Sequence, residues 1–172
     1  MPSLSTLLGQ IRYAAQKWDD SAWWRQEREI LSLYPYERGV LPHPTLAQLR
    51  EIVYDGKEHW EECDIVCLDW FRSAQGKTYL NVLKHRPGLF FFYQEPHGIF
   101  FQFREVGGEE FVPLVPKENT EPVTRSIGGT DTHFPATAFV SREVAWEIVQ
   151  KFVFTQRRAK VVTWVAAENF HS

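Results

Sequence analysis

The stretch that decides the fold is Leu89-Phe90-Phe91-Phe92-Tyr93-Gln94-Glu95-Pro96-His97-Gly98-Ile99-Phe100-Phe101-Gln102-Phe103. Two aromatic runs, 89–93 and 99–103, flank a short connection with Pro and Gly, which is typical of a turn between antiparallel strands. Both runs are apolar on both faces, so alternation does not mark a side that faces water. Such strands lie in the centre of a sheet that is covered on each face. The stretch therefore predicts a central antiparallel hairpin.

Similar runs of aromatic and β-branched residues lie on either side of this hairpin, separated by short segments rich in Gly and Pro. The expected strands are Asp64–Phe71, Thr78–Lys84, Leu89–Gln94, Ile99–Glu105 and Glu110–Leu114. They predict an antiparallel meander of about five to six strands, centred on residues 63–115. With N-terminal helices and a C-terminal helix-strand unit packed on this sheet, the fold class is α+β.

The N-terminal part, residues 1–56, is predicted to be mainly helical. Apolar residues recur at spacings of three and four from Leu4 to Leu33, which favours two amphipathic helices. After a loop from Gly39 to Pro44, we expect Thr45 to cap a short helix that ends at Gly56. The apolar face of that helix consists of Leu46, Leu49, Ile52 and Val53.

The C-terminal part is predicted to contain a long surface loop, then a helix, then a strand. The polar segment 116–134, with its Gly128-Gly129 pair, indicates the loop. Over residues 135–172, Ser141 is expected to cap a helix from Arg142 to about Phe154, and Lys160–Val165 to return as a strand. Because 172 residues suit one hydrophobic core, we expect residues 1–172 to form a single domain.

The composition argues against several classes of function. The 19 Lys and Arg residues and 22 Asp and Glu residues give a formal net charge of −3, so no broad basic field attracts nucleic acid. The first residues lack a basic leader, and no stretch reaches the ~20 apolar residues that a membrane span requires. With only two cysteines, the chain is expected to be cytoplasmic.

One cluster resembles a metal site. The order His59-Trp60-Glu61 followed by Cys63 and Cys67 is reminiscent of zinc deaminases, which present His-x-Glu before Pro-Cys-x-x-Cys. Here the two cysteines have three residues between them and no preceding proline. On a strand they would lie ~13 Å apart, too far for two zinc bonds of ~2.3 Å. We therefore expect core thiols, with no metal and no cofactor.

No catalytic motif is recognisable. The glycine pairs lack the Gly-x-Gly-x-x-Gly and Walker spacings, and no Gly-x-Ser-x-Gly elbow occurs. A catalytic triad or carboxylate pair assembled in space stays open, since such sites are not sequential. The histidines are scattered through predicted loops and termini as His43, His59, His85, His97, His133 and His171. We expect these six to be solvated loop residues.

Acidic residues gather in the predicted loops. They form either a solvated surface or one that meets a basic partner. The second interpretation assigns partner binding to Glu61, Glu62, Glu109, Glu110, Glu118, Glu121 and Asp131, with Trp60 as an aromatic anchor. Basic residues cluster only at Arg157, Arg158 and Lys160, where they are expected to close the preceding helix.

The C-terminal third carries a family resemblance. The segment Phe134–Ser141, the helix residues Ala145 to Phe152 and the strand Val161-Val162-Thr163-Trp164 resemble the Imm1 family of bacterial immunity proteins. The resemblance implies a non-catalytic cytoplasmic protein that binds and blocks a cognate polymorphic toxin domain, often a nucleic-acid deaminase.

The resulting hypothesis is that the chain occludes the basic active-site cleft of a toxin, with no nucleic-acid or membrane partner. Two alternatives stay open. A small-molecule-binding enzyme would present a deep pocket with a strongly shifted acid or base. A single-stranded nucleic-acid binder would show affinity that falls steeply with salt.

Overall fold

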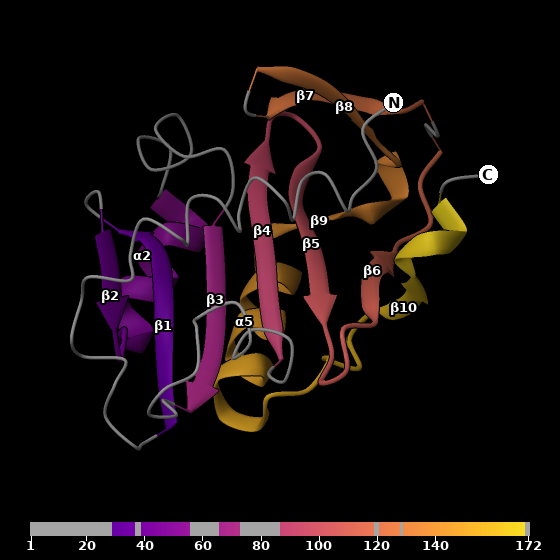
Figure 1. Ribbon diagram of the computed structural model, residues 1–172. Coiled ribbons are helices and arrows are strands. Elements are labelled where there is room, and N and C mark those ends of the chain that lie inside the picture. The colour runs from indigo at the N-terminus through magenta and orange to yellow at the C-terminus, as the bar shows by residue number, and fades with distance from the viewer. Residues whose placement is uncertain are drawn as a thin grey trace.

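The computed structural model describes residues 29–36, 39–55, 66–72, 87–118, 121–127 and 129–170. These residues form an eight-stranded antiparallel sheet in the order β10-β6-β5-β4-β3-β1-β2, with β9 also paired to β5 (Figure 1). The bounds of its strands are β1 Glu29–Tyr36, β2 Gly39–Pro42, β3 Val66–Arg72, β4 Gly88–Gln94, β5 Gly98–Arg104, β6 Glu110–Leu114, β9 Phe139–Val140 and β10 Thr163–Ala166.

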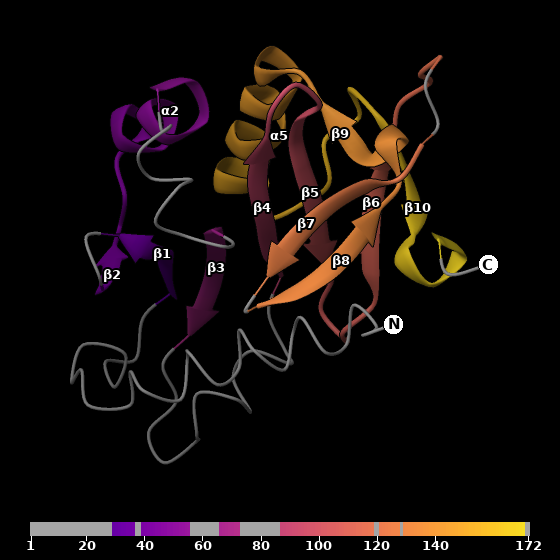
Figure 2. The ribbon, with the colours of Figure 1, turned by 90° about the horizontal axis from the view of Figure 1, so that it is seen from above.

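The described elements form three layers. Helices α2 (Leu46–Asp55) and α5 (Arg142–Thr155) lie side by side on one face of the sheet. A two-stranded hairpin, β7 (Val123–Ile127) and β8 (Thr130–Phe134), crosses the opposite face (Figure 2). Two short 3₁₀ helices complete the described part: η2 (Ala136–Ala138) precedes β9, and η3 (Ala167–Phe170) follows β10.

The helical face of the central hairpin is aromatic. Phe91 of β4 lies opposite Phe101 of β5, and their rings stack with centroids 5.2 Å apart. Phe103 points to the same side, since it follows Phe101 by two residues, and its ring meets that of Phe152 in α5 edge to face at 5.9 Å. Helix α5 therefore seals this face.

The other face of the same two strands is also aromatic. Phe92 lies opposite Phe100 with ring centroids 5.0 Å apart. Phe134 of β8 packs on both rings, with its centroid 5.0 Å from that of Phe92 and 4.8 Å from that of Phe100. Each fully buried Phe stabilises the fold by roughly 1.5–3 kcal/mol. The predicted central position of β4 and β5, with a covering layer on each face, is confirmed.

Both described helices begin at the predicted caps. The backbone N–H and the hydroxyl of Thr45 donate to Gln48 Oε1 at 2.8 and 2.9 Å, and the Gln48 N–H donates to Thr45 Oγ1 at 3.2 Å. At α5, Ser141 Oγ accepts from the N–H of Val144 at 3.4 Å. Of the apolar face expected for α2, Leu49, Ile52 and Val53 are buried, while Leu46 is 37% exposed. The buried residues of α5 are Ala145, Ile148, Val149 and Phe152.

The prediction that residues 1–56 are mainly helical is wrong for two segments. Glu29–Tyr36 is strand β1, although Ile30, Leu31 and Leu33 fitted a helical spacing. β1 pairs with β3 over six residues, from Glu29 opposite Arg72 to Tyr34 opposite Cys67, and this pairing overrides a weak local preference. The expected loop after it contains β2. Residues 1–28 lie outside the described residues.

The predicted long loop over residues 116–134 is also wrong, because most of it is the β7–β8 hairpin. Its strands are short and polar on the outside, and their inward residues Val123, Ile127 and Phe134 are spaced for a sheet. Gly129 occupies the turn with φ +79, a conformation that glycine adopts without strain. Only one face of the hairpin packs on the sheet, so its sequence contains few apolar residues and looks like a loop.

The α+β class and the antiparallel meander are confirmed. The sheet is larger than the expected meander because β1, β2 and β9 join it. The expected strand Lys160–Val165 begins later, as β10 at Thr163. The expected strand Thr78–Lys84 and the expected helix end at Gly56 lie outside the described residues.

Candidate functional site

The first acidic pair lies at the turn between β5 and β6. Glu109 is exposed in this turn, and Glu110 is the half-buried first residue of β6. Gln102 of β5, which is 1% exposed, donates from Nε2 to Glu110 Oε2 at 2.7 Å. One carboxylate oxygen of Glu110 therefore satisfies a buried amide within the sheet, and Glu109 is the residue of this pair that faces solvent.

The second acidic group surrounds the β7–β8 hairpin. Glu118 and Glu121 are exposed in the connection that leads from β6 to β7. Asp131 is exposed on β8, opposite Ser126 in the register and next to the hairpin turn. Glu118 and Glu121 thus precede one end of the hairpin, Asp131 lies by its other end, and the hairpin itself crosses the face of the sheet away from α5 (Figure 2). We call these three carboxylates the acidic hairpin group.

The two groups occupy different regions. β6 runs for five residues between them, which separates the β5–β6 turn from the acidic hairpin group by ~13 Å or more along the strand. The structure therefore places Glu118 and Glu121 before the hairpin and Asp131 by its turn, and it places Glu109 and Glu110 in a separate region at the β5–β6 turn. The other expected partner-binding residues, Trp60, Glu61 and Glu62, lie outside the described residues.

Arg125 fixes the hairpin to the sheet. From β7 its Nη1 donates to Tyr93 O at 2.9 Å and to Gln94 Oε1 at 3.2 Å, both at the end of β4. Its guanidinium also lies 4.7 Å from the centroid of the Phe92 ring, within the range of a cation–π contact. The hairpin is therefore preformed rather than free to swing.

Lys117 holds the connection that precedes the hairpin. Its Nζ donates to His97 O at 3.1 Å and lies 5.9 Å from the centre of the Phe139 ring. Burial lowers the pKa of Lys117 from its usual 10.5, since desolvation disfavours the charged amine. The adjacent Glu118 is thereby presented by an anchored backbone.

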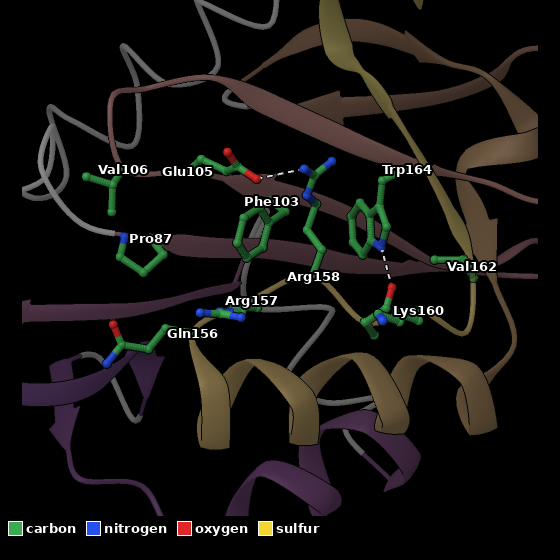
Figure 3. A pocket seen from close by; sticks show the side chains of 11 residues that line it. Pro87, Phe103, Glu105, Val106, Gln156, Arg157, Arg158, Lys160, Val162 and Trp164 are labelled. Carbon is green, nitrogen blue, oxygen red and sulfur yellow. Dashed lines mark hydrogen bonds and ion pairs between the residues drawn. The ribbon is translucent and has the colours of Figure 1, made fainter.

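A groove opens elsewhere on the molecule, between the end of α5, strand β10 and the β5–β6 turn (Figure 3). Its volume is about 590 Å³, and Phe103, Val162 and Trp164 contribute apolar walls. The cations Arg157, Arg158 and Lys160 line it as well. The sequence showed these cations as a cluster but assigned them only to helix termination. We call this site the connector groove.

The described part of the chain contains no cluster of metal-ligating side chains. No three His, Cys, Asp or Glu residues of the described ranges are grouped as metal ligands. Cys67 lies on β3, while Cys63 is outside the described residues. His133 shares a 2.8 Å hydrogen bond with Thr124 Oγ1 on the hairpin.

One carboxylate has a perturbed acidity. Glu143 lies in the first turn of α5. Its pKa is lowered by a hydrogen bond from its own backbone N–H and by one from the Ser141 side chain. This is an effect of the helix cap, and Glu143 lies on the helical side of the sheet.

None of the described helices has the length and apolar character of a membrane span. The sequence model of one protein family, described as Immunity protein Imm1, matches residues 41–166, which is more than half of the chain. The match includes the meander, the hairpin, α5 and β10. Among curated proteins, none matches.

Proposed function

Because the chain belongs to the Imm1 family of immunity proteins, we propose that it binds a cognate bacterial toxin domain and neutralises it by covering the active site. In this proposal the toxin acts on nucleic acid, as a deaminase does, and the immunity protein meets it in the cytoplasm. The immunity protein performs no reaction itself. One immunity protein inhibits one toxin molecule. Inhibition requires slow dissociation, so that the complex persists while the toxin's substrate is present.

The observation that carries the proposal is the anchored acidic hairpin. Glu118, Glu121 and Asp131 are exposed. Lys117, next to Glu118, and Arg125, opposite Thr132 next to Asp131, are hydrogen-bonded to His97 O and Tyr93 O. A preformed surface loses less conformational entropy on binding than a mobile loop. An enzyme that handles nucleic acid needs a basic groove for the phosphates. The acidic hairpin group is therefore complementary in charge to the part of the toxin that must be blocked.

Exposed carboxylates of this kind act mainly on the rate of encounter. They steer a basic partner over distances comparable with the Debye length, about 8 Å at physiological ionic strength. The contacts that slow dissociation come from aromatic anchors buried in the interface. Trp60, with Glu61 and Glu62 beside it, remains our proposed anchor.

Co-expression tests the function directly. Cells that produce the toxin encoded next to this gene should survive when the immunity protein is present and die when it is absent. The purified pair should form a 1:1 complex in which the toxin is inactive. Death of the co-expressing cells, or an active toxin in the complex, contradicts the proposal.

Charge reversal tests the surface. The double variant Glu118→Lys with Asp131→Lys should bind the toxin with an association rate reduced about tenfold or more at low salt, and the difference should shrink as salt is added. The matched control is Glu51→Lys with Glu147→Lys, which reverses two exposed carboxylates on the helical side. Equal association rates for the two double variants would assign the interface to another surface.

A further inference from the structure

We infer that the connector groove is a binding site for an acidic peptide segment of a partner protein, one that carries Asp or Glu next to an apolar side chain. The site is distinct from the acidic hairpin group and has the opposite charge. The inference is independent of the proposed toxin binding, because the groove can be tested with the purified protein and a synthetic peptide.

The groove is preformed by the connection between α5 and β10. Gln156 ends α5 in a left-handed conformation with φ 56, and its N–H donates to Phe152 O at 2.8 Å. Further along, the indole of Trp164 donates from Nε1 to Ala159 O at 2.8 Å (Figure 3). Ala159 itself is only 5% exposed. The connection is thus fixed at both ends, and the groove exists before any ligand arrives.

The charge in the groove is unbalanced. Arg158 Nη2 pairs with Glu105 Oε1 at 2.8 Å, and the guanidinium carbon lies 3.8 Å from the centre of the Phe111 ring. Arg157 and Lys160 are exposed, and within the described ranges neither has an ion-pair partner. Three cations therefore face one carboxylate, on a chain whose net charge is −3. This local excess selects an anionic ligand.

Helix termination does not account for these cations. The last turn of α5 contains no basic residue, and Arg157, Arg158 and Lys160 follow its C-cap at Gln156. Arg158 is directed across the groove to Glu105 and Phe111. Stabilisation of the helix macrodipole falls off beyond the last turn, so it does not require three cations at these positions.

Exposed apolar side chains accompany the charge. Val106, which lines the groove, is 65% exposed. Val162 and Trp164, which are partly exposed, line it as well. Apolar side chains left in water beside cations are typical of a surface that another protein covers. The partner segment should therefore contribute an apolar side chain as well as carboxylates.

A peptide fits this groove better than a nucleotide. Phe103 is 2% exposed, and its ring already meets those of Phe152 and Trp164 edge to face, so it offers no open face for a base. No glycine of the described ranges lines the groove, so it lacks the cradle of backbone N–H groups that is typical of nucleotide phosphate sites. Arginine side chains can still bind carboxylates in a planar, two-bonded geometry.

The test is a titration of the full-length ¹⁵N-labelled protein, followed at the indole N–H of Trp164 and the amides of residues 156–162. The probe is an acetylated peptide, Asp-Glu-Leu-Asp-Glu-Leu. Its matched control, Asn-Gln-Leu-Asn-Gln-Leu, keeps the shape and removes the charge. ATP and inorganic phosphate serve as the phosphate arms. We expect the acidic peptide to shift these signals and to bind at least about tenfold more tightly than the amide peptide, ATP or phosphate.

Variants locate the site. In Arg157→Ala with Lys160→Ala, the affinity for the acidic peptide should fall about tenfold or more, while Lys151→Ala, which removes a cation from α5 away from the groove, should leave it unchanged. Arg157 and Lys160 are exposed, so their replacement should not disturb the core. Unchanged signals from residues far from the groove would show that the double variant is folded. Equal binding of both peptides, no shift with either, preference for phosphate, or an unaffected double variant would overturn the inference.

Discussion

Gly98 shows how one residue sets the join between two elements. It begins β5 with φ +104, directly before the point where Ile99 pairs with Val140 of β9. A Cβ at Gly98 would overlap the carbonyl oxygen of Val140. Strand β9 leads through Ser141 into α5, so this close approach also positions the helix.

Replacing Gly98 by alanine should therefore destabilise the protein by two effects, the strain of a positive φ and the clash of the new Cβ with Val140 O. Gly107 is the matched control, because its φ of +111 is similar and nothing lies within 4 Å of an added Cβ. We expect Gly107→Ala to cost about 1–2 kcal/mol of backbone strain and Gly98→Ala about 1–3 kcal/mol more. Urea unfolding of both variants measures the difference. Equal free energies of unfolding would show that β9 moves away without cost.

Residue-scale contacts are where the sequence was least informative. Glu110 stays a predicted partner-binding residue, but the sequence did not indicate that it also accepts a hydrogen bond from Gln102. Nothing in the sequence pairs these two side chains, since their contact follows from the register of β5 and β6. The groove shares this property, because Glu105, Arg158 and Trp164 come from three separate segments.

At the scale of elements, the sequence predicted the helices and strands whose ends are set by local features such as caps and turns. The caps at Thr45 and Ser141 and the apolar stripes fixed α2 and α5, and the Gly and Pro turns fixed β4, β5 and β6. β1 and the β7–β8 hairpin were missed because their conformation depends on neighbours. β1 is held by β3, and the hairpin is held by the aromatic face beneath it.

Arg125 is one anchor of the hairpin, beside the packing of Phe134, and it can be removed. Arg125→Met keeps an apolar side chain on Phe92 but loses the hydrogen bonds to Tyr93 O and Gln94 Oε1. We expect the opening free energy of β7 and β8 to fall by about 1–3 kcal/mol, as for hydrogen bonds of a charged donor. Amide hydrogen exchange should show faster exchange in β7 and β8 and unchanged exchange in β4 and β5.

Ser126→Ala is the control for this experiment, since Ser126 is exposed on the same strand. Its exchange should match that of the unmodified protein. If Arg125→Met also left the hairpin amides protected, packing of Phe134 alone would hold the hairpin, and the acidic group would not depend on Arg125.

At the scale of the whole molecule, the buried residues form one cluster that joins α2, the sheet, α5 and the hairpin. Leu33, Leu49, Phe92 and Phe152 all belong to it. A shared core couples the stability of the elements it connects. This continuity supports our proposal that residues 1–172 form a single domain.

Thermal unfolding should then occur in one transition. For 172 residues the enthalpy of unfolding is expected to be about 120 kcal/mol near 60 °C, and the calorimetric and van't Hoff values should agree. Tryptophan fluorescence and far-ultraviolet circular dichroism should give the same midpoint. Separate midpoints, or a calorimetric enthalpy well above the van't Hoff value, would divide the chain into more than one folding unit.

The outermost strands of the described sheet have a further consequence. β2 and β10 are four residues long each, and β2 ends at Pro42, which has no N–H to offer. The phenylalanine-rich strands β4 and β5, which would be the most prone to aggregate at an edge, lie between other strands. These two short edge strands thus offer few unpaired backbone groups for strand exchange or fibril growth between copies. In our proposal the protein is a stoichiometric inhibitor, which the cell needs in excess of the toxin, and short edge strands lower the tendency to aggregate at such concentrations.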